Sequence, residues 1–406
     1  MDKKAIRYFT PGLLAMAAVL AVQPALAQDA SFSMSGFGTL GLVATDTDAA
    51  EFRIAGQPNG ARKRASGEVD SKLAVQLGAK FNPMFSGTVQ ILSRQNGEGS
   101  FKPQVEWAFL KAQLTPELSV RLGRLGAPLF AVSDFRYVGY ANVWLRPPQE
   151  VYGQIPFSTF NGADLGYSTS IGSATLNVQV FAGKSKDVVV GSDLEVKKFV
   201  GANATLDLGN GLALRLGHAQ GNTTLNAQDV GGLVQLLRAN LGATPFASVA
   251  EEIDPTEKKS TFSGLGLSYD EGDWIASAEF TRRRMHSIIP STTGWFASVG
   301  HRFGAFTPYV VVSDLKVDDG NVNNTIPSVG PTAQLSAVVN AVVASQRAEQ
   351  STTALGLRWD VARNMALKTQ WDRVDVKNAG GLFLLLDPAW SKGKVNVVSV
   401  ALDFVF

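Results

Sequence analysis

The side chains that could perform catalysis are few in this sequence. Histidine occurs only at His218, His286 and His301, and cysteine is absent. Nucleophilic catalysis needs a histidine beside a serine and a third group that orients it, and no nucleophile motif surrounds a serine here. A metal site needs ligands at fixed spacing, and the sequence has neither cysteines nor a suitably spaced histidine pair. We therefore predict no enzymatic activity, no metal site and no cofactor.

Another group of reactive side chains lies in the stretch 121–161. This stretch holds five aromatic residues between Phe130 and Trp144, four prolines and charges of both signs, a composition that suits neither a strand nor a helix. Because arginine binds carboxylate and phosphate through two parallel hydrogen bonds, such a stretch can contact anions. The charges best placed to define a narrow opening, together with arginines outside this stretch, are Asp134, Arg136, Arg146 and Glu150.

The elements that must position this stretch are strands. Segments of roughly ten residues with alternating polar and apolar side chains recur as far as the last residue, a length that suits tilted strands crossing a bilayer. We count sixteen: 31–45, 71–82, 85–94, 105–115, 118–124, 162–171, 173–184, 200–208, 212–220, 261–269, 274–285, 295–303, 306–313, 353–361, 365–376 and 395–406.

The connections between these segments alternate in length. Short turns alternate with long loops, which lie at 46–70, 125–161, 185–198, 221–259, 314–350 and 377–393. The shorter connections 95–104 and 286–292 fall on the same side of this alternation as the long loops. Short periplasmic turns and long extracellular loops are typical of an antiparallel outer-membrane barrel, whereas a soluble β-sandwich has no reason to segregate loop lengths. The fold class predicted is all-β, a transmembrane antiparallel β-barrel of sixteen strands.

Two of the long loops carry a helical pattern. Apolar residues recur at helical spacing in 228–241 and again in 333–347. We predict a helix in each and expect both to pack on the rim of the barrel.

The first 27 residues have the pattern of a cleaved signal peptide. Lys3, Lys4 and Arg7 precede an apolar core, and a small-x-small site at 25–27 ends it. We predict cleavage after residue 27 and a single barrel domain over 28–406. Because the leader carries three basic residues and one acidic residue, the mature chain is neutral, and its charge gives no reason to expect nucleic-acid binding.

The last ten residues, VVSVALDFVF, alternate apolar side chains and end on Phe406. This pattern resembles the terminal strand of Gram-negative outer-membrane barrels, and with the leader and the sixteen segments the whole mature chain resembles the sixteen-stranded porin family. The resemblance implies outer-membrane localisation, recognition by the barrel-assembly machinery and a homotrimer. It also implies that the third long loop, about 125–161, folds inward as a constriction. The acidic PEFGG-type motif of enterobacterial porins is absent from this loop, which leaves the solute open.

Alternation of side chains predicts which charges face the lumen. Placing the large aromatics of the strands outward leaves ten basic and five acidic residues inside. The outward set is Trp274, Phe280, Trp295, Phe303, Phe306, Trp359 and Trp371. The basic set is Lys72, Lys80, Arg94, Lys111, Arg121, Arg215, Arg283, Arg302, Arg358 and Lys368, and the acidic set is Asp164, Asp207, Glu279, Asp360 and Asp372.

A positive lumen would concentrate anions. We expect a water-filled channel for passive diffusion of small hydrophilic solutes and ions, with a weak preference for anions or organic acids. A substrate-specific uptake channel and a structural or adhesive barrel are the alternatives. The constriction charges could instead staple the loop to the wall, and Arg282, Arg283 and Arg284 could contact lipopolysaccharide or simply form a solvated rim.

Overall fold

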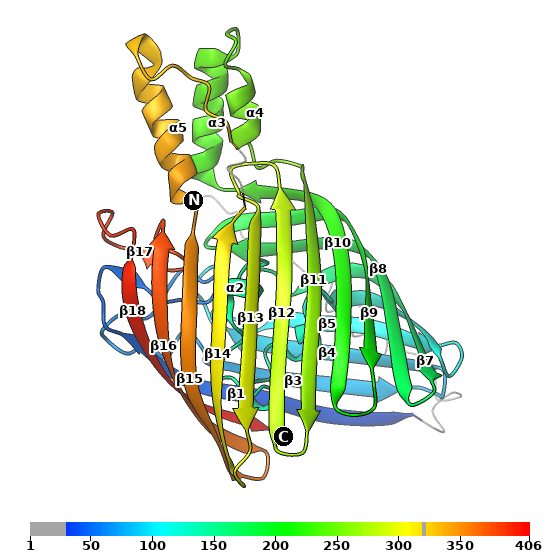
Figure 1. Ribbon diagram of the computed structural model, residues 1–406. Helices are drawn as coiled ribbons and strands as arrows, with labels where there is room; N and C mark the ends of the chain where they lie inside the picture. The colour runs from blue at the N-terminus through cyan, green and yellow to red at the C-terminus, as the bar shows by residue number, and fades with distance from the viewer. Residues whose placement is uncertain (1–29, 319–321) are drawn as a thin grey trace, which may run out of the picture.

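A computed structural model of the chain describes residues 30–318 and 322–406, so the predicted signal peptide lies outside the described residues. Sixteen antiparallel strands close into a barrel (Figure 1). This confirms the predicted fold class and every one of the sixteen segments. The barrel strands are β1 (Ser31–Thr45), β3 (Lys72–Lys80), β4 (Phe85–Arg94), β5 (Gln104–Gln113), β6 (Leu118–Gly126), β7 (Thr159–Ile171), β8 (Ala174–Val189), β9 (Ser192–Asp207), β10 (Leu212–Asn226), β11 (Lys258–Glu271), β12 (Trp274–Met285), β13 (Thr292–His301), β14 (Phe306–Val317), β15 (Glu349–Ala362), β16 (Met365–Asn378) and β18 (Gly393–Val405).

The first and last strands close the barrel. Phe37 of β1 pairs with Val405 of β18, and Gly36 exchanges two backbone hydrogen bonds with Phe406, at 2.8 and 3.0 Å. A closed barrel leaves no unpaired strand edge, which a bilayer requires because it offers no water to backbone groups.

Side-chain burial alternates along the strands as the sequence pattern predicts. In β14 the exposed residues from Phe306 onward alternate with buried ones. The seven aromatic residues predicted to face outward are all exposed, from 38% for Trp371 to 62% for Phe303. Their sequence neighbours, such as Glu279 and Arg358, contact the loop inside the barrel. The assignment of faces is therefore confirmed for this set.

One predicted long loop is wrong. Residues 185–198 form no loop, because β8 and β9 run on and pair until Val189 and Ser192. The turn between them holds Val190 and Gly191, both at positive φ. The predicted hairpin at Gly209 and Gly211 is confirmed, since both residues have the positive φ that favours glycine.

Three helices stand together at the long-loop end of the barrel, opposite the C-terminus (Figure 1). They are α3 (Gln228–Leu241), α4 (Ser248–Ile253) and α5 (Ala333–Ser345), which confirms both predicted helices. Their apolar faces bury one another together with Ile288 and Ile326, and the described part of this cluster contains no barrel-strand residue. The helices therefore bury their apolar faces mainly against one another, and they meet the rim of the barrel through Ile288 of the connection between β12 and β13. No described helix is long and apolar enough to cross a membrane.

An ion pair on the surface of this helical cap joins α3 to the end of α4. The Arg238 guanidinium donates to Glu251 at 2.8 Å and to Asp254 at 2.7 Å. Partial burial alone would raise the pKa of Asp254, but hydrogen bonds from Thr256 and Arg238 outweigh it and lower this pKa.

A small second sheet also lies at the long-loop end (Figure 1). It pairs β2 (Ala50–Glu51) of the first loop with β17 (Leu384–Leu385) of the last. Phe52 and Phe383 meet edge to face beneath it, 5.6 Å apart. The first and last loops thus fold as one unit with the strands that they connect.

Candidate functional site

The third long loop, residues 127–158, lies inside the barrel, and we call it the inner loop. It contains the short helices η2 (Ser133–Phe135), η3 (Gly139–Ala141) and α2 (Gln149–Tyr152). Proline fixes φ and disfavours helix in the residue before it, and Pro148 is extended, at φ −56° and ψ 122°. The chain is therefore extended at Pro148 and turns into α2 directly afterwards.

Cationic side chains of the wall hold the inner loop by its backbone. Four wall residues from β10, β12, β15 and β16 donate hydrogen bonds to its carbonyl oxygens. Arg215 binds Pro128 (2.7 Å), Arg283 binds Gln154 (2.6 Å), Arg358 binds Tyr140 (2.7 Å) and Asn142 (3.1 Å), and Lys368 binds Gly139 (2.7 Å), Asn142 (2.6 Å) and Trp144 (2.9 Å). Carbonyl oxygens satisfy these donors without removing their positive charge.

Gly139 lies at a close contact between the inner loop and the wall. A Cβ at this position would be 2.1 Å from Oδ1 of Asp403, and Lys368 Nζ lies 2.9 Å from Oδ2 of the same carboxylate. Only glycine permits this approach, so the carboxylate, the ammonium group and the loop backbone pack together.

Arg146 is the most completely bound charge of the inner loop. Its Nε and Nη2 donate to Asp70 at 3.0 and 2.7 Å, Nη1 donates to Asp372 at 3.2 Å, and Nη2 also donates to Ser399 at 2.5 Å. Burial alone would lower the pKa of the guanidinium, but the charges of the two aspartates raise it above its ordinary value. Arg146 therefore ties the loop to the first loop and to two strands.

Glu150 is also buried, 2% exposed, and accepts hydrogen bonds from neutral groups. Its donors are Ser313 (2.9 Å), Gln350 (2.6 Å) and Thr352 (2.5 Å), from β14 and β15. The side chains of Arg146 and Glu150 thus make the stapling contacts that were the alternative to a constriction role.

Asp134 and Arg136 differ from these two residues. Asp134 is exposed and Arg136 is half-buried, and within the described chain neither forms an ion pair. The Arg136 guanidinium lies 5.1 Å from the ring centre of Tyr137 and 5.8 Å from that of Phe130, which are cation–π distances. Of the four predicted constriction charges, these two are the ones that remain open to water.

Aromatic side chains of the inner loop pack into the wall. Trp144 is buried and donates from Nε1 to Ser298 at 2.8 Å, and its ring meets Phe296 edge to face. The Tyr152 ring stacks on Phe130, 4.6 Å between centres, and its hydroxyl donates to Glu279 at 2.9 Å. These contacts wedge the loop against β12 and β13.

Comparison with known proteins agrees with this architecture. The model of the family described as Gram-negative porin matches residues 13–301, most of the chain. The chain belongs to this family. No curated protein sequence matches it.

Solved structures similar to this porin are outer-membrane proteins. An anion-selective porin from Comamonas acidovorans is 14% identical, with a TM-score of 0.55 over 93% of this chain and 100% of the other. The trimer form of OmpT from Vibrio cholerae is 10% identical, with a TM-score of 0.54 over 93% and 99%. The channel DcaP of Acinetobacter baumannii is 11% identical, with a TM-score of 0.54 over 93% and 97%. At these identities the likeness shows the fold alone, and with the family it establishes an outer-membrane channel.

The three remaining residues predicted for the pore wall, Arg94, Arg121 and Arg302, have different environments. Arg94 donates to the carbonyl of Gln95 at 3.2 Å and lies over the Tyr137 ring, 4.8 Å from its centre, so it too touches the inner loop. Arg121 pairs with Asp164 across β6 and β7 at 2.6 Å. Arg302 lies beyond the end of β13, and its hydrogen bonds join the short turn at Gly272 and Asp270.

Three acidic residues at the porin's inner loop escaped the sequence-based set. Asp70 binds Arg146, Glu106 accepts from Ser158 at 2.6 Å, and Asp403 accepts from Thr39 at 2.6 Å. Asp403 could have been found, since it alternates with the outward residues of the terminal strand. Glu106 lies at a register shift in β5, which breaks the alternation.

The histidines of the porin do not gather into a site. Nδ1 of His218 lies 2.8 Å from Oγ of Ser263, but His218 is exposed and shares a strand face with Leu216, which is 63% exposed. The residues that the structure describes include no group of three or more side chains that could hold a metal ion. Family and fold are those of a channel.

Proposed function

We propose that the porin forms a water-filled channel for passive diffusion of small hydrophilic solutes, with a weak preference for anions and small organic acids. The observation that carries this proposal is the bonding of Arg94, Arg215 and Arg283. Each donates to a backbone carbonyl, and in the described chain none has a carboxylate as an ion-pair partner. Their positive charge therefore acts on the lumen.

The preference is expected to be weak because other cations are neutralised. Arg121, Arg146, Arg358 and Lys368 each pair with at least one aspartate, at 2.6 to 3.2 Å. Glu106 and Asp403, the acidic residues of the wall that the sequence pattern missed, further reduce the excess of basic over acidic side chains in the lumen. A narrow passage between low-dielectric walls focuses the field of the charges that remain. The similar structure from Comamonas acidovorans is that of an anion-selective porin, which supports the proposal.

Reversal potentials across a KCl gradient in planar bilayers test the proposal. We expect the wild type to favour chloride and Arg215→Gln to reduce that preference. A unit charge about 8 Å from an ion in water contributes about 0.5 kcal/mol, so the permeability ratio should change about twofold. Arg302→Gln is the matched control, because Arg302 lies at the short turn, and it should change nothing. Cation selectivity of the wild type would refute the proposal.

A substrate-specific uptake channel is the competing function, and an apolar cavity beside the inner loop favours it. Conductance that saturates with one organic acid and is blocked by it would support specific uptake. Conductance proportional to concentration for many solutes would support general diffusion.

We further propose a homotrimer, which the trimer form of the similar OmpT supports. Closure of single insertions in three equal steps would agree with a trimer.

We propose that lipopolysaccharide phosphates contact Arg284, which is exposed at the end of β12. We also propose that the barrel-assembly machinery recognises Phe406, which is 55% exposed. Cleavage after residue 27 is testable by sequencing the N-terminus of the membrane-inserted protein.

A further inference from the structure

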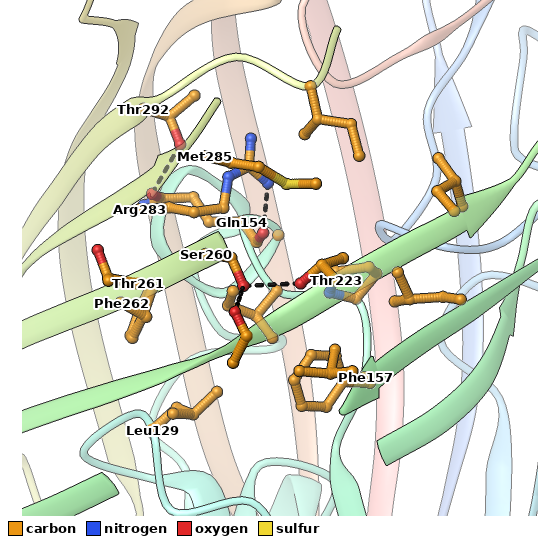
Figure 2. Close-up of a pocket in the computed structure, with 18 of the residues that line it drawn as sticks. Leu129, Gln154, Phe157, Thr223, Ser260, Thr261, Phe262, Arg283, Met285 and Thr292 are labelled. Atoms are coloured by element: carbon orange, nitrogen blue, oxygen red, sulfur yellow. Dashed lines mark hydrogen bonds between the residues drawn. The ribbon is translucent and has the colours of Figure 1, made fainter. Parts of the chain in front are cut away.

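A cavity of about 310 Å³ lies between the end of the inner loop and the wall strands β9 to β12 (Figure 2). This is the lower end of the volume range of small-molecule sites. Its walls are mostly apolar, and they include Leu129, Phe157, Val196 and Phe262. The lining also includes Pro290 and Gln346, which belong to connections at the long-loop end of the barrel.

Arg283 is the one charged side chain among the described residues that line this cavity. Nη1 donates to the carbonyl of Gln154 at 2.6 Å and Nη2 to that of Pro290 at 3.1 Å, while Nε has no hydrogen-bond partner. A guanidinium has five donors, and an unmet donor beside apolar surface costs free energy. The group therefore has unused capacity for an acceptor that carries negative charge.

The other polar side chains of the cavity lining are neutral: they are Gln154, Gln220, Thr261, Thr292 and Gln346, together with a pair of hydroxyl groups. Oγ1 of Thr223 and Oγ of Ser260 are 2.7 Å apart, and the Ser260 hydroxyl also lies 3.2 Å from the carbonyl of Gly221 (Figure 2). These groups are paired with each other. They therefore offer neither a second charge nor a carboxylate that would neutralise Arg283.

We propose that this cavity binds a small monocarboxylate with an apolar body, either a short aliphatic chain or one aromatic ring. The carboxylate accepts from the Arg283 guanidinium, and the apolar body lies against Leu129, Phe157 and Phe262. A dicarboxylate would bring a second charge onto apolar surface without a partner, and an amine would face Arg283 with like charge. The inference rests on the proposed function in one respect, which is that organic anions enter the barrel.

Isothermal titration calorimetry of the porin in lipid nanodiscs, with empty nanodiscs as the blank, tests the site. The probes are acetate, butyrate, hexanoate, hexanol and hexylamine. Burial of each methylene contributes up to about fourfold in affinity, so hexanoate should bind at least about 10-fold more tightly than acetate. Hexylamine should not bind above the blank. Equal binding of hexylamine and hexanoate, or no binding of hexanoate, would overturn the inference.

Two variants separate the head group from the apolar body. Arg283→Gln should weaken hexanoate about 10-fold, because a hydrogen bond to a charged group is lost, and should weaken hexanol much less, because hexanol carries no charge. Ala219→Leu adds apolar volume at a lining position and keeps Arg283 in the sequence, and it should abolish the chain-length dependence. Hexanoate binding unchanged in both variants would place the acid elsewhere and refute the site. If either variant fails to fold, the wild-type probe series decides alone.

The same samples distinguish this inference from the proposed function. Loss of the hexanoate site with chloride selectivity intact would overturn the inference only. Cation selectivity in bilayers with hexanoate binding retained would overturn the anion preference and leave the site.

Discussion

Replacement of Arg146 by alanine is expected to release the inner loop from the wall. The change removes hydrogen bonds to Asp70, Asp372 and Ser399 and leaves two aspartates, 2% and 4% exposed, without their cation. Breaking a buried ion pair by removing one partner costs about 3–5 kcal/mol. Taking about 3 kcal/mol, because the lumen can admit water to the carboxylates, shifts the docked loop toward undocked states by about 100-fold.

Single-channel recording measures this release as increased open-channel noise and more frequent closures in Arg146→Ala. Arg136→Ala is the matched control, because Arg136 is half-buried, lacks an ion pair among the described residues and contacts only rings of the loop itself. The control should change ion selectivity with wild-type noise. Arg146→Met combined with Asp70→Asn and Asp372→Asn should restore quiet openings, because it leaves no unpaired charge. Wild-type noise in Arg146→Ala would refute the assignment of Arg146 as the staple.

Three further predictions concern the loop contact and the helical cap. Gly139→Ala should increase channel noise, because overpacking costs about 1–3 kcal/mol, whereas Gly266→Ala, whose nearest atom would be 3.4 Å away, should not. Leu237→Asp should speed proteolysis of the cap without changing barrel melting, since Leu237 is fully buried and Leu236, the control, is 50% exposed. The pKa of Asp254 is lowered in the folded chain, so the Asp254 carboxylate contributes stability at pH values above 3.8, its ordinary pKa. This contribution is lost as the pH falls through the lowered pKa. Carboxyl NMR would follow the titration of Asp254, and proteolysis of the cap should be faster at pH 3 than at pH 6.

The sequence was sufficient for the strands because a bilayer imposes one apolar face on every strand. That constraint ends at the membrane surface. The segment 185–198, which was wrongly predicted as a loop, lies at the long-loop end of β8 and β9. There β8 and β9 continue with charged residues such as Lys186 and Asp187, so the alternation of apolar residues is interrupted although the pairing is not. Helix α3 was predicted with its observed bounds because its apolar spacing is local.

The contacts of the inner loop could not be predicted in the same way. Arg146 binds partners 76 and 226 residues away, and Lys368 binds a carbonyl 229 residues away. A single sequence records that these residues are charged, but not which of them meet. The composition of the loop indicated an unusual segment, whereas the division into buried staples and open charges depends on the packing of the whole barrel.

This packing makes the attachment of the loop and the charge of the lumen depend on the same side chains. Arg215 and Arg283 hold the loop through neutral carbonyl oxygens, so they keep their charge while they bind. A wall that used Asp–Arg pairs throughout would carry no net charge and would produce a weaker field in the lumen. Substituting a carbonyl-bound arginine should therefore change selectivity and loop mobility together. Neutralising Arg146 and Asp70 together removes one charge of each sign and should change mobility alone.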